Sequence, residues 1–172
     1  MGNGITGNRD DIADVQEDVV DVQSDIGNVQ DVIVSHDSRL DKVEKIGSVW
    51  FDAWRTTFAD AGTLTYEYVR RASSYPNAMD INNGVFTAPL AGTYQFITQV
   101  AKSFSVEAEL TIVHDGTIIS WIADMDKPNG ATLTGTAIVS MEIGQKVWVE
   151  TKYLLLSGLP AIQFTGALLS AN

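Results

Sequence analysis

Apolar residues in the first quarter of the chain recur at alternating steps of three and four residues. The pattern runs from residue 12 to residue 43 and contains one polar residue, a histidine. A seven-residue repeat of this kind predicts an α-helical coiled coil, in which these side chains form the seam between helices. We expect the helix over residues 10–46, after a flexible leader at 1–9. The expected seam residues are Ile12, Val15, Val19, Val22, Ile26, Val29, Ile33, His36, Leu40 and Val43.

The core positions of this repeat are filled by β-branched residues. Ile or Val occupies every a and d position before residue 34. Ile at a with Leu at d favours dimers, whereas β-branched residues at both positions favour three or more helices. The seam therefore predicts a homotrimer. His36 falls on position d, where three imidazoles would meet on the axis and could bind a metal, or where a polar residue simply sets the register.

From about residue 47 the heptads give way to short runs of β-branched and aromatic residues between Gly, Asn and Pro. Many short strands without intervening helical patterns are typical of a β-sandwich or jelly roll. We expect a mainly β globular head over 47–172. The expected strands are 49–57, 63–69, 84–87, 92–102, 107–114, 117–123, 131–141, 146–155 and 161–169.

Alternation along these strands predicts which side chains share a face. The Asp115-Gly116 pair predicts a tight hairpin, because both residues accept the positive φ of a type I′ turn. One face is expected to carry Tyr94, Phe96 and Thr98. Another is expected to carry Leu110 and Ile112 together with Ile118 and Trp121.

Composition narrows the function classes. The formal net charge of −11 argues against nucleic-acid binding, which needs clustered Lys and Arg. The chain has no cysteine, so disulfides and thiolate metal sites are excluded. No apolar run reaches the roughly 18–20 residues of a membrane span, and the N-terminus lacks the regions of a signal peptide.

The helical segment is unusually acidic. Every charged residue from Asp10 to Asp37 is a carboxylate. One interpretation is a solvated outer face that keeps the helix soluble. The other is a calcium- or pH-responsive stalk, in which cations or protons relieve the repulsion. The sequence requires no cofactor, and calcium is the ion that this acidic stalk suggests.

Four stretches of the head resemble the complement C1q globular domain. The most specific is Phe86-Thr87-Ala88-Pro89-Leu90-Ala91-Gly92-Thr93-Tyr94-Gln95-Phe96, which matches the family's Phe, Ala-Pro and Gly-x-Tyr-x-Phe run. The others are Val49–Ala53, Ile143–Val149 and the closing Phe164–Leu169. Gln145 stands where an Asp often follows the Gly in that family. The four stretches occur in the family's order along the head.

This resemblance implies a ten-stranded jelly-roll head, similar to that of tumour necrosis factor and assembled as a trimer, here on a coiled-coil stalk. It also implies an extracellular location. The function it suggests is a secreted, trimeric, lectin-like recognition protein of the innate-immunity type. Such a protein binds glycans, microbial surfaces or proteins through avidity. The alternative is a structural or matrix protein, whose head mainly trimerises and whose acidic stalk interacts with ions or other chains.

Two loops carry the candidate ligand-binding residues. An aromatic residue, an amide and two guanidinium groups near one loop suit an acidic glycan, and these are Arg70, Arg71, Tyr75 and Asn77. A second loop could present oxygens to calcium or to a sugar through Asp124, Asp126, Lys127 and Asn129. Both segments also suit ordinary exposed turns.

The catalytic inventory is small. The two histidines, His36 and His114, lie far apart in the sequence, and no metalloprotease helix, phosphate-binding loop or nucleophile elbow is present. Glu107 and Glu109 lie on one side of an expected strand, which is more typical of a solvated face than of an acid–base pair. The sequence therefore predicts that the protein is not an enzyme.

Overall fold

The structure is a computed structural model. It describes residues 4–57, 59–73, 75, 77–102, 107–125, 130–152 and 162–172, and the side chains from residue 12 onward. The chain separates into two compact units, Met1–Asp41 and Lys42–Asn172. Each unit is described by itself.

The first unit is helical. Helix α1 spans Gly4–Lys45 and so begins six residues before the predicted start at residue 10. Residues 4–9, which were expected in the leader, continue the helix, because each added residue gains a backbone hydrogen bond once a helix exists. The C-terminal end follows the prediction closely: Gly47 has φ +72°, the left-handed conformation that ends many helices. No described helix is long and apolar enough to cross a membrane.

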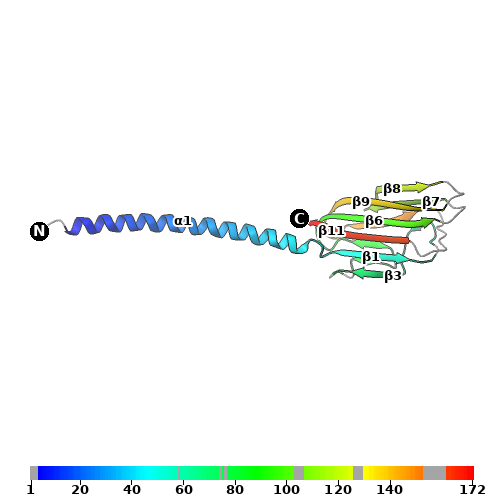
Figure 1. Cartoon of the computed structure of the whole chain (residues 1–172), viewed down its shortest axis with the longest axis horizontal. Coiled ribbons are helices and arrows are strands. Elements are labelled where there is room, and N and C mark those ends of the chain that lie inside the picture. Colours follow the sequence, from blue (N-terminus) through cyan, green and yellow to red (C-terminus); the bar gives the residue numbers. More distant parts are fainter. Residues whose placement is uncertain are drawn as a thin grey trace. The chain divides into compact units, whose positions relative to one another are not determined.

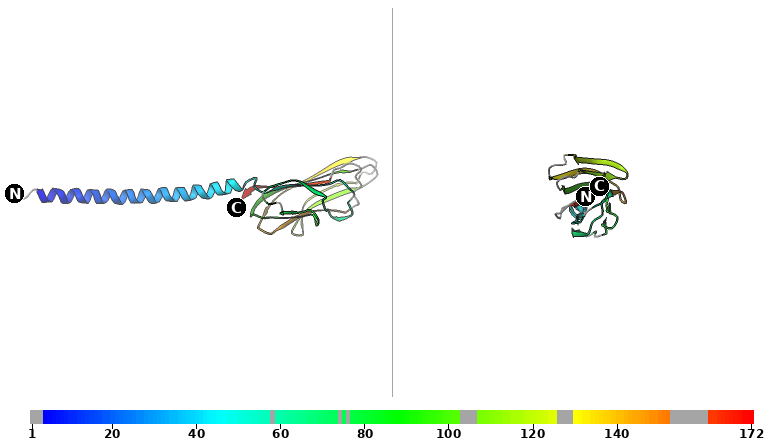
Figure 2. Two further views of the ribbon diagram at one scale, coloured as in Figure 1. Left: turned by 90° about the horizontal axis from the view of Figure 1, so that it is seen from below. Right: turned by 90° about the vertical axis from the view of Figure 1, so that its right-hand side faces the viewer.

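The head is a sandwich of two antiparallel sheets (Figures 1 and 2). The five-stranded sheet has the order β3-β1-β11-β6-β9, and the six-stranded sheet has the order β4-β5-β10-β7-β8, with β2 paired to β10. The strands of the first sheet are β1 Trp50–Arg55, β3 Tyr68–Ala72, β6 Gly92–Lys102, β9 Ala131–Met141 and β11 Ile162–Ala171. Those of the second are β2 Gly62–Thr63, β4 Met79–Asp80, β5 Val85–Thr87, β7 Ala108–His114, β8 Thr117–Asp124 and β10 Lys146–Thr151.

This architecture confirms the predicted mainly β, jelly-roll-like head, although the described residues form eleven strands where ten were expected. Two predicted strands, 92–102 and 131–141, have the observed bounds. The predicted strand 63–69 is wrong as a unit, since it divides into β2 and β3. Leu64 and Tyr66 lie between these two strands, and their side chains are buried. Their backbone N–H groups donate hydrogen bonds to carbonyl groups in or next to strands of the six-stranded sheet. Strand β4 was not predicted, because two residues carry no detectable period.

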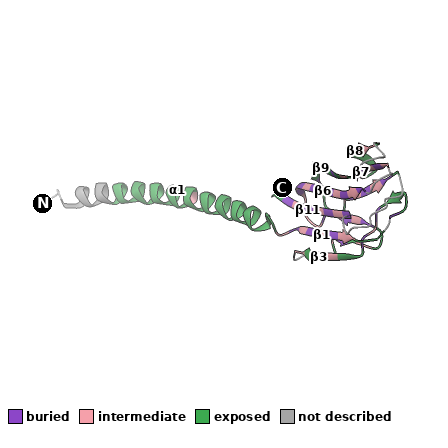
Figure 3. Ribbon diagram, turned by 45° about the vertical axis from the view of Figure 1, so that its right-hand side comes forward, coloured by how far each residue is buried: buried purple, intermediate pink, exposed green. Residues whose placement is uncertain are grey.

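Aromatic side chains fill the space between the sheets. Phe51, Phe96 and Phe164 belong to the five-stranded sheet. Phe51 and Phe96 pack against Phe86, and all three rings pack against one another, with ring centroids 5.0–6.5 Å apart. Phe86 comes from β5 of the opposite sheet, so its ring joins the two layers. Buried and half-buried residues alternate strictly along β6, which Figure 3 shows as a purple and pink alternation. The prediction that Tyr94, Phe96 and Thr98 share one face is confirmed, and this face is the buried one.

The hairpin between β7 and β8 has the predicted turn. Asp115 and Gly116 have φ values of 45° and 85°, so both central residues have positive φ. Asp115 also fixes the turn to the neighbouring strand, since its Oδ1 accepts a hydrogen bond from the Lys146 N–H at 2.9 Å.

The prediction that Ile118 and Trp121 share a face with Leu110 and Ile112 is wrong. Leu110 and Ile112 are buried as expected, but Ile118 and Trp121 are 59% and 60% exposed. Ile118 lies opposite Val113, so ordinary alternation places it on the face away from Ile112. Trp121 follows a bulge: Ile112 pairs with Ser120, so Ile119 has no opposite residue. An extra residue in one strand reverses the faces that follow it. Ile122 therefore packs on the core and Trp121 points outward.

Candidate binding surfaces

The outward face of the five-stranded sheet is half-buried and carries small side chains at its centre. Successive strands place Trp50, Ala167, Gln95 and Ile138 in one row across the sheet. Ile138 is 65% exposed, although it is a large apolar residue. We call this surface, which includes the next row of Asp52, Thr165, Ile97 and Thr136, the five-stranded face.

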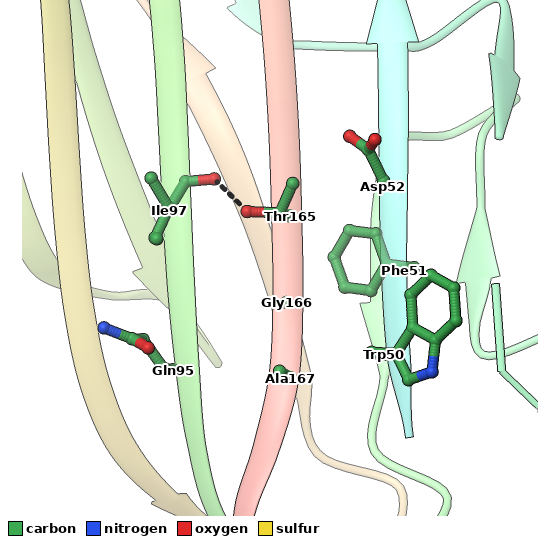
Figure 4. A pocket seen from close by; sticks show the side chains of 8 residues that line it. All are labelled: Trp50, Phe51, Asp52, Gln95, Ile97, Thr165, Gly166 and Ala167. Atoms are coloured by element: carbon green, nitrogen blue, oxygen red, sulfur yellow. Dashed lines mark hydrogen bonds between the residues drawn. The ribbon is translucent and has the colours of Figure 1, made fainter. Parts of the chain in front are cut away.

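A shallow hollow of about 270 Å³ lies on this face. It forms because β11 carries only small residues between the larger side chains of β1 and β6 (Figure 4). Thr165 closes its floor with a hydrogen bond from Oγ1 to the carbonyl of Ile97. The hollow is lined by Trp50, Phe51, Asp52, Gln95, Ile97, Thr165, Gly166 and Ala167.

Asp52 is the polar centre of one edge of the hollow. Its Oδ1 accepts hydrogen bonds from the Trp54 indole N–H at 2.6 Å and from the Gln163 amide at 2.9 Å. The Arg70 guanidinium carbon lies 5.6 Å from the centroid of the Trp54 ring, within the range of a cation–π contact. The carboxylate, the indole and the guanidinium are thus held in fixed relative positions at the sheet edge.

The first set of predicted ligand residues lies on and after β3. Arg70 and Arg71 are exposed on this edge strand. Tyr75 and Asn77 are exposed in the connection to β4. The Tyr94 hydroxyl donates to the Leu90 carbonyl at 2.7 Å, and burial raises the pKa of Tyr94, with a smaller contribution from Tyr75. The four residues are therefore exposed on the edge strand β3 and in the connection that follows it.

The second predicted set lies at the opposite end of the strands. Asp124 ends β8, and its Oδ2 lies 2.9 Å from the fully buried ammonium of Lys102 at the end of β6. Asp126, Lys127 and Asn129 lie outside the described residues. Asp52 is in register with Ile97, so Lys102 is about 17 Å further along the strands at ~3.3 Å per residue. The two predicted sets do not form one site.

The outward face of the six-stranded sheet carries an exposed aromatic surface that the sequence reasoning missed. Trp121 lies opposite Thr111, which lies opposite Glu150, while Ile118 and Trp148 flank Val113 in the next row. The Trp148 indole N–H donates to Glu150 Oε1 at 2.7 Å. The sequence carried one signal for this surface, the adjacent pair Ile118 and Ile119. Strict alternation places adjacent residues on opposite faces, so it cannot bury these two together with Ile122. We call this surface, centred on Trp121, the six-stranded face.

The carboxyl group of Glu67 and the hydroxyl group of Tyr66, both near β3, have shifted pKa values. Glu67 accepts hydrogen bonds from the hydroxyl and N–H groups of Thr56 and Thr57, and these contacts lower its pKa to about 2. Burial raises the pKa of Tyr66, whose hydroxyl has no hydrogen-bond partner among the described residues. Glu67 ties the end of β1 to the start of β3, which is a structural role.

The seam residues of α1 lie along one side of the helix. The nine apolar members are each 49–62% exposed, and His36 is also exposed. Within the described part of the chain, no group of three or more His, Asp or Glu residues could hold a metal ion. Calcium binding and a His36 metal site remain predictions.

The head is thus a jelly-roll-like sandwich whose notable surfaces are sheet faces and edges. The sequence pattern that defines the C1q domain matches residues 63–169, which is more than half of the chain. The chain therefore belongs to the C1q domain family. Domains of this family are non-enzymatic recognition or structural modules, are generally extracellular, and typically trimerise.

The fold comparison agrees. The globular domain of zebrafish complement 1qA protein superposes with a TM-score of 0.59 and 19% sequence identity, covering 73% of this chain and 99% of that chain. At this identity the likeness concerns the fold alone. No curated protein matches the sequence.

Proposed function

We propose that this protein is a secreted, trimeric recognition molecule whose C1q-like head binds glycans on cell or microbial surfaces, with affinity multiplied by three linked sites. The exposed Trp121 is the observation that carries this proposal. Trp121 lies on the outward face of the edge strand β8 and is 60% exposed, so it has no role in the head's own core. Ile118 is 59% exposed on the same face, and apolar side chains that are exposed together mark interaction sites.

The chemistry around Trp121 suits a sugar ring. An indole presents a flat apolar surface to the C–H face of a pyranose. Glu150, two strands away in the same row, offers carboxylate oxygens to the hydroxyl groups of a sugar. Trp148 is held in place by its hydrogen bond to Glu150. A preorganised aromatic side chain loses little conformational entropy on binding.

The five-stranded face supports self-association. It combines the hollow over β11 with the exposed Ile138, so one copy offers a depression and a second copy can offer an apolar projection. Contacts between two different patches close into a ring when the rotation is one third of a turn. The seam of α1 would then join the three stalks as a coiled coil, as its β-branched residues favour.

The edge and end sets stay proposals as secondary contact sites. Arg70 and Arg71 would attract an acidic sugar, and the segment containing Asp124, Asp126, Lys127 and Asn129 would present oxygens to calcium or to hydroxyl groups. Asp124 already neutralises Lys102, so its carboxylate is the least available member.

A glycan array probed with the intact protein tests the function. We expect binding that Trp121→Ala abolishes and that Ile143→Ala, a control at an equally exposed apolar residue of the β9–β10 turn, preserves. Loss in an Arg70→Ala/Arg71→Ala variant alone would move the site to the β3 edge. Sedimentation must give three copies per particle for the avidity argument to hold.

A structural or matrix role is the second candidate, and the exposed acidic side chains of α1 favour it. In that case the array stays blank while the particle remains trimeric. Removal of calcium with a chelator would then change the assembly of the intact protein.

A further inference from the structure

Among the side chains that the structure describes on α1, apolar residues form an exposed stripe. Nine Ile, Val and Leu side chains from Ile12 to Val43 lie along one side of α1, each about half exposed. A stripe of this length is stable in water only when it is covered. The part of the helix from 12 to 38 contains no Lys or Arg, so any covering chain has to tolerate many carboxylates.

One part of the stripe has the arrangement of a coiled-coil hole, the depression between four residues that receives a side chain of the neighbouring helix. A hollow of about 270 Å³ is framed by Val22 and Val29 at d, Ile26 at a and Asp25 at g, with Gln30 beside them. Two successive d residues with the a and g residues between them form the hole that accepts an a-position side chain from a parallel helix. In a copy at the same height, that side chain is Ile26.

The flanks of the stripe decide what each carboxylate meets. In a parallel, in-register coiled coil, a g residue of one helix faces the e residue five positions further along its neighbour. The acidic g positions then face amides, and the basic one faces a carboxylate. The pairs are Asp18 with Gln23, Asp25 with Gln30 and Arg39 with Glu44, while Val32 faces Asp37.

We infer that the stalk binds parallel, in-register copies of itself, with Asp18 and Asp25 accepting hydrogen bonds from Gln23 and Gln30 of the neighbouring helix. This inference rests on the proposed trimer, because rotational symmetry makes the three helices parallel. Amide donors satisfy the carboxylates without adding charge. The acidic stalk therefore associates without a bridging cation, and calcium is not needed for its assembly.

Disulfide trapping tests the register. The chain has no cysteine, so a single introduced thiol is unique. Under oxidation, full-length Val29→Cys should give disulfide-linked pairs on a non-reducing gel, because d-position side chains of in-register copies meet across the seam. Ser24→Cys, at the outward f position, is the matched control and should remain uncrosslinked. Absence of pairs for Val29→Cys in a particle that sediments as a trimer would overturn the inference but not the trimer.

Charge placement tests the amide pairs. Gln23→Glu/Gln30→Glu puts carboxylate against carboxylate across the seam and should lower the temperature at which the helix melts. Ser24→Glu/Ser38→Glu adds the same charge on the outward face and should lower it less. A chelator should leave the melting temperature of the unsubstituted protein unchanged. Equal effects of the two variants, or melting that depends on calcium, would contradict the inference. A particle that sediments as a single chain would instead overturn the proposed trimer.

Discussion

Gly166 decides how closely the aromatic core packs. A Cβ built on this residue would lie 2.4 Å from Phe51 Cε1 and 2.8 Å from Phe96 Cε1. Both atoms belong to rings that are buried in a dense cluster, so they have little room to move. The absent methyl group allows β11 to pass between two rings.

We therefore expect Gly166→Ala to lower the free energy of unfolding of the head by about 1–3 kcal/mol through overpacking. Chemical denaturation followed by tryptophan fluorescence measures this change. Gly27→Ala is the matched control, because nothing lies within 4 Å of the added Cβ there. In the helix that change should stabilise by about 1 kcal/mol. An unchanged head in Gly166→Ala would mean that the rings can move aside.

Glu67 links stability to acidic pH. Its pKa falls from the ordinary value of 4.5 to about 2 in the folded head, because the Thr56 and Thr57 groups donate hydrogen bonds to the carboxylate. A depressed pKa in the folded state contributes stability above the unfolded pKa, which is lost as pH falls toward 2. Glu67→Gln should therefore reduce stability at neutral pH and make little difference near pH 2. Denaturation curves across this range check the prediction, with Glu142→Gln as an exposed control.

At the scale of elements, Lys102 and Asp124 join the ends of β6 and β8, one from each sheet. The Lys102 side chain is fully buried, and the carboxylate lies 2.9 Å from its ammonium. Removing one member of a buried ion pair leaves an uncompensated charge, which typically costs about 3–5 kcal/mol.

We expect Asp124→Ala to destabilise the head markedly, and Lys102→Met/Asp124→Leu to recover most of the loss. An apolar pair of similar volume often equals a buried ion pair in stability. Thermal melts of the two variants beside the unsubstituted protein check this. If the double variant is as unstable as the single one, other contacts of these two residues hold the sheet ends together.

The bulge in β8 shows where the pattern of apolar residues stopped being informative. Strands β6 and β9 were predictable to the residue, because eleven residues of alternation leave one consistent assignment of faces. In β8 the extra residue Ile119 changes the face of its neighbours, and only pairing with β7 reveals it. As a result, Trp121 lies on the opposite face from Leu110 and Ile112, with which it was expected to share a face.

At the scale of the whole molecule, the hollow on the five-stranded face is the expected contact between copies. Ala167→Tyr would fill it with a ring while leaving the core side of β11 unchanged. We expect this variant to fold but to lose the trimeric head contact, seen as a smaller particle or weaker association by sedimentation. Asn82→Tyr, at an exposed turn of the six-stranded sheet, is the control. A fully trimeric Ala167→Tyr would place the contact elsewhere.

The candidate site was only partly predictable for a physical reason. Arg70, Arg71, Tyr75 and Asn77 were chosen because exposed turns and polar residues are visible in a sequence. Whether they lie near the segment after Asp124 depends on strand pairing, and the register separates them. Trp121 was hidden because exposure of an aromatic residue follows from its neighbours and not from its own type.

The sequence by itself determined the periodicities: a heptad seam of branched aliphatic residues, alternating strands, and a turn whose two residues accept positive φ. These are local properties, set by backbone geometry and by the side chains a few residues away. The tertiary structure alone decided which strands are neighbours, where β8 bulges and which tryptophan faces solvent. It also decided that position 166 has no room for a side chain. Those features arise from contacts between residues distant in the chain, whose pairing no local pattern encodes.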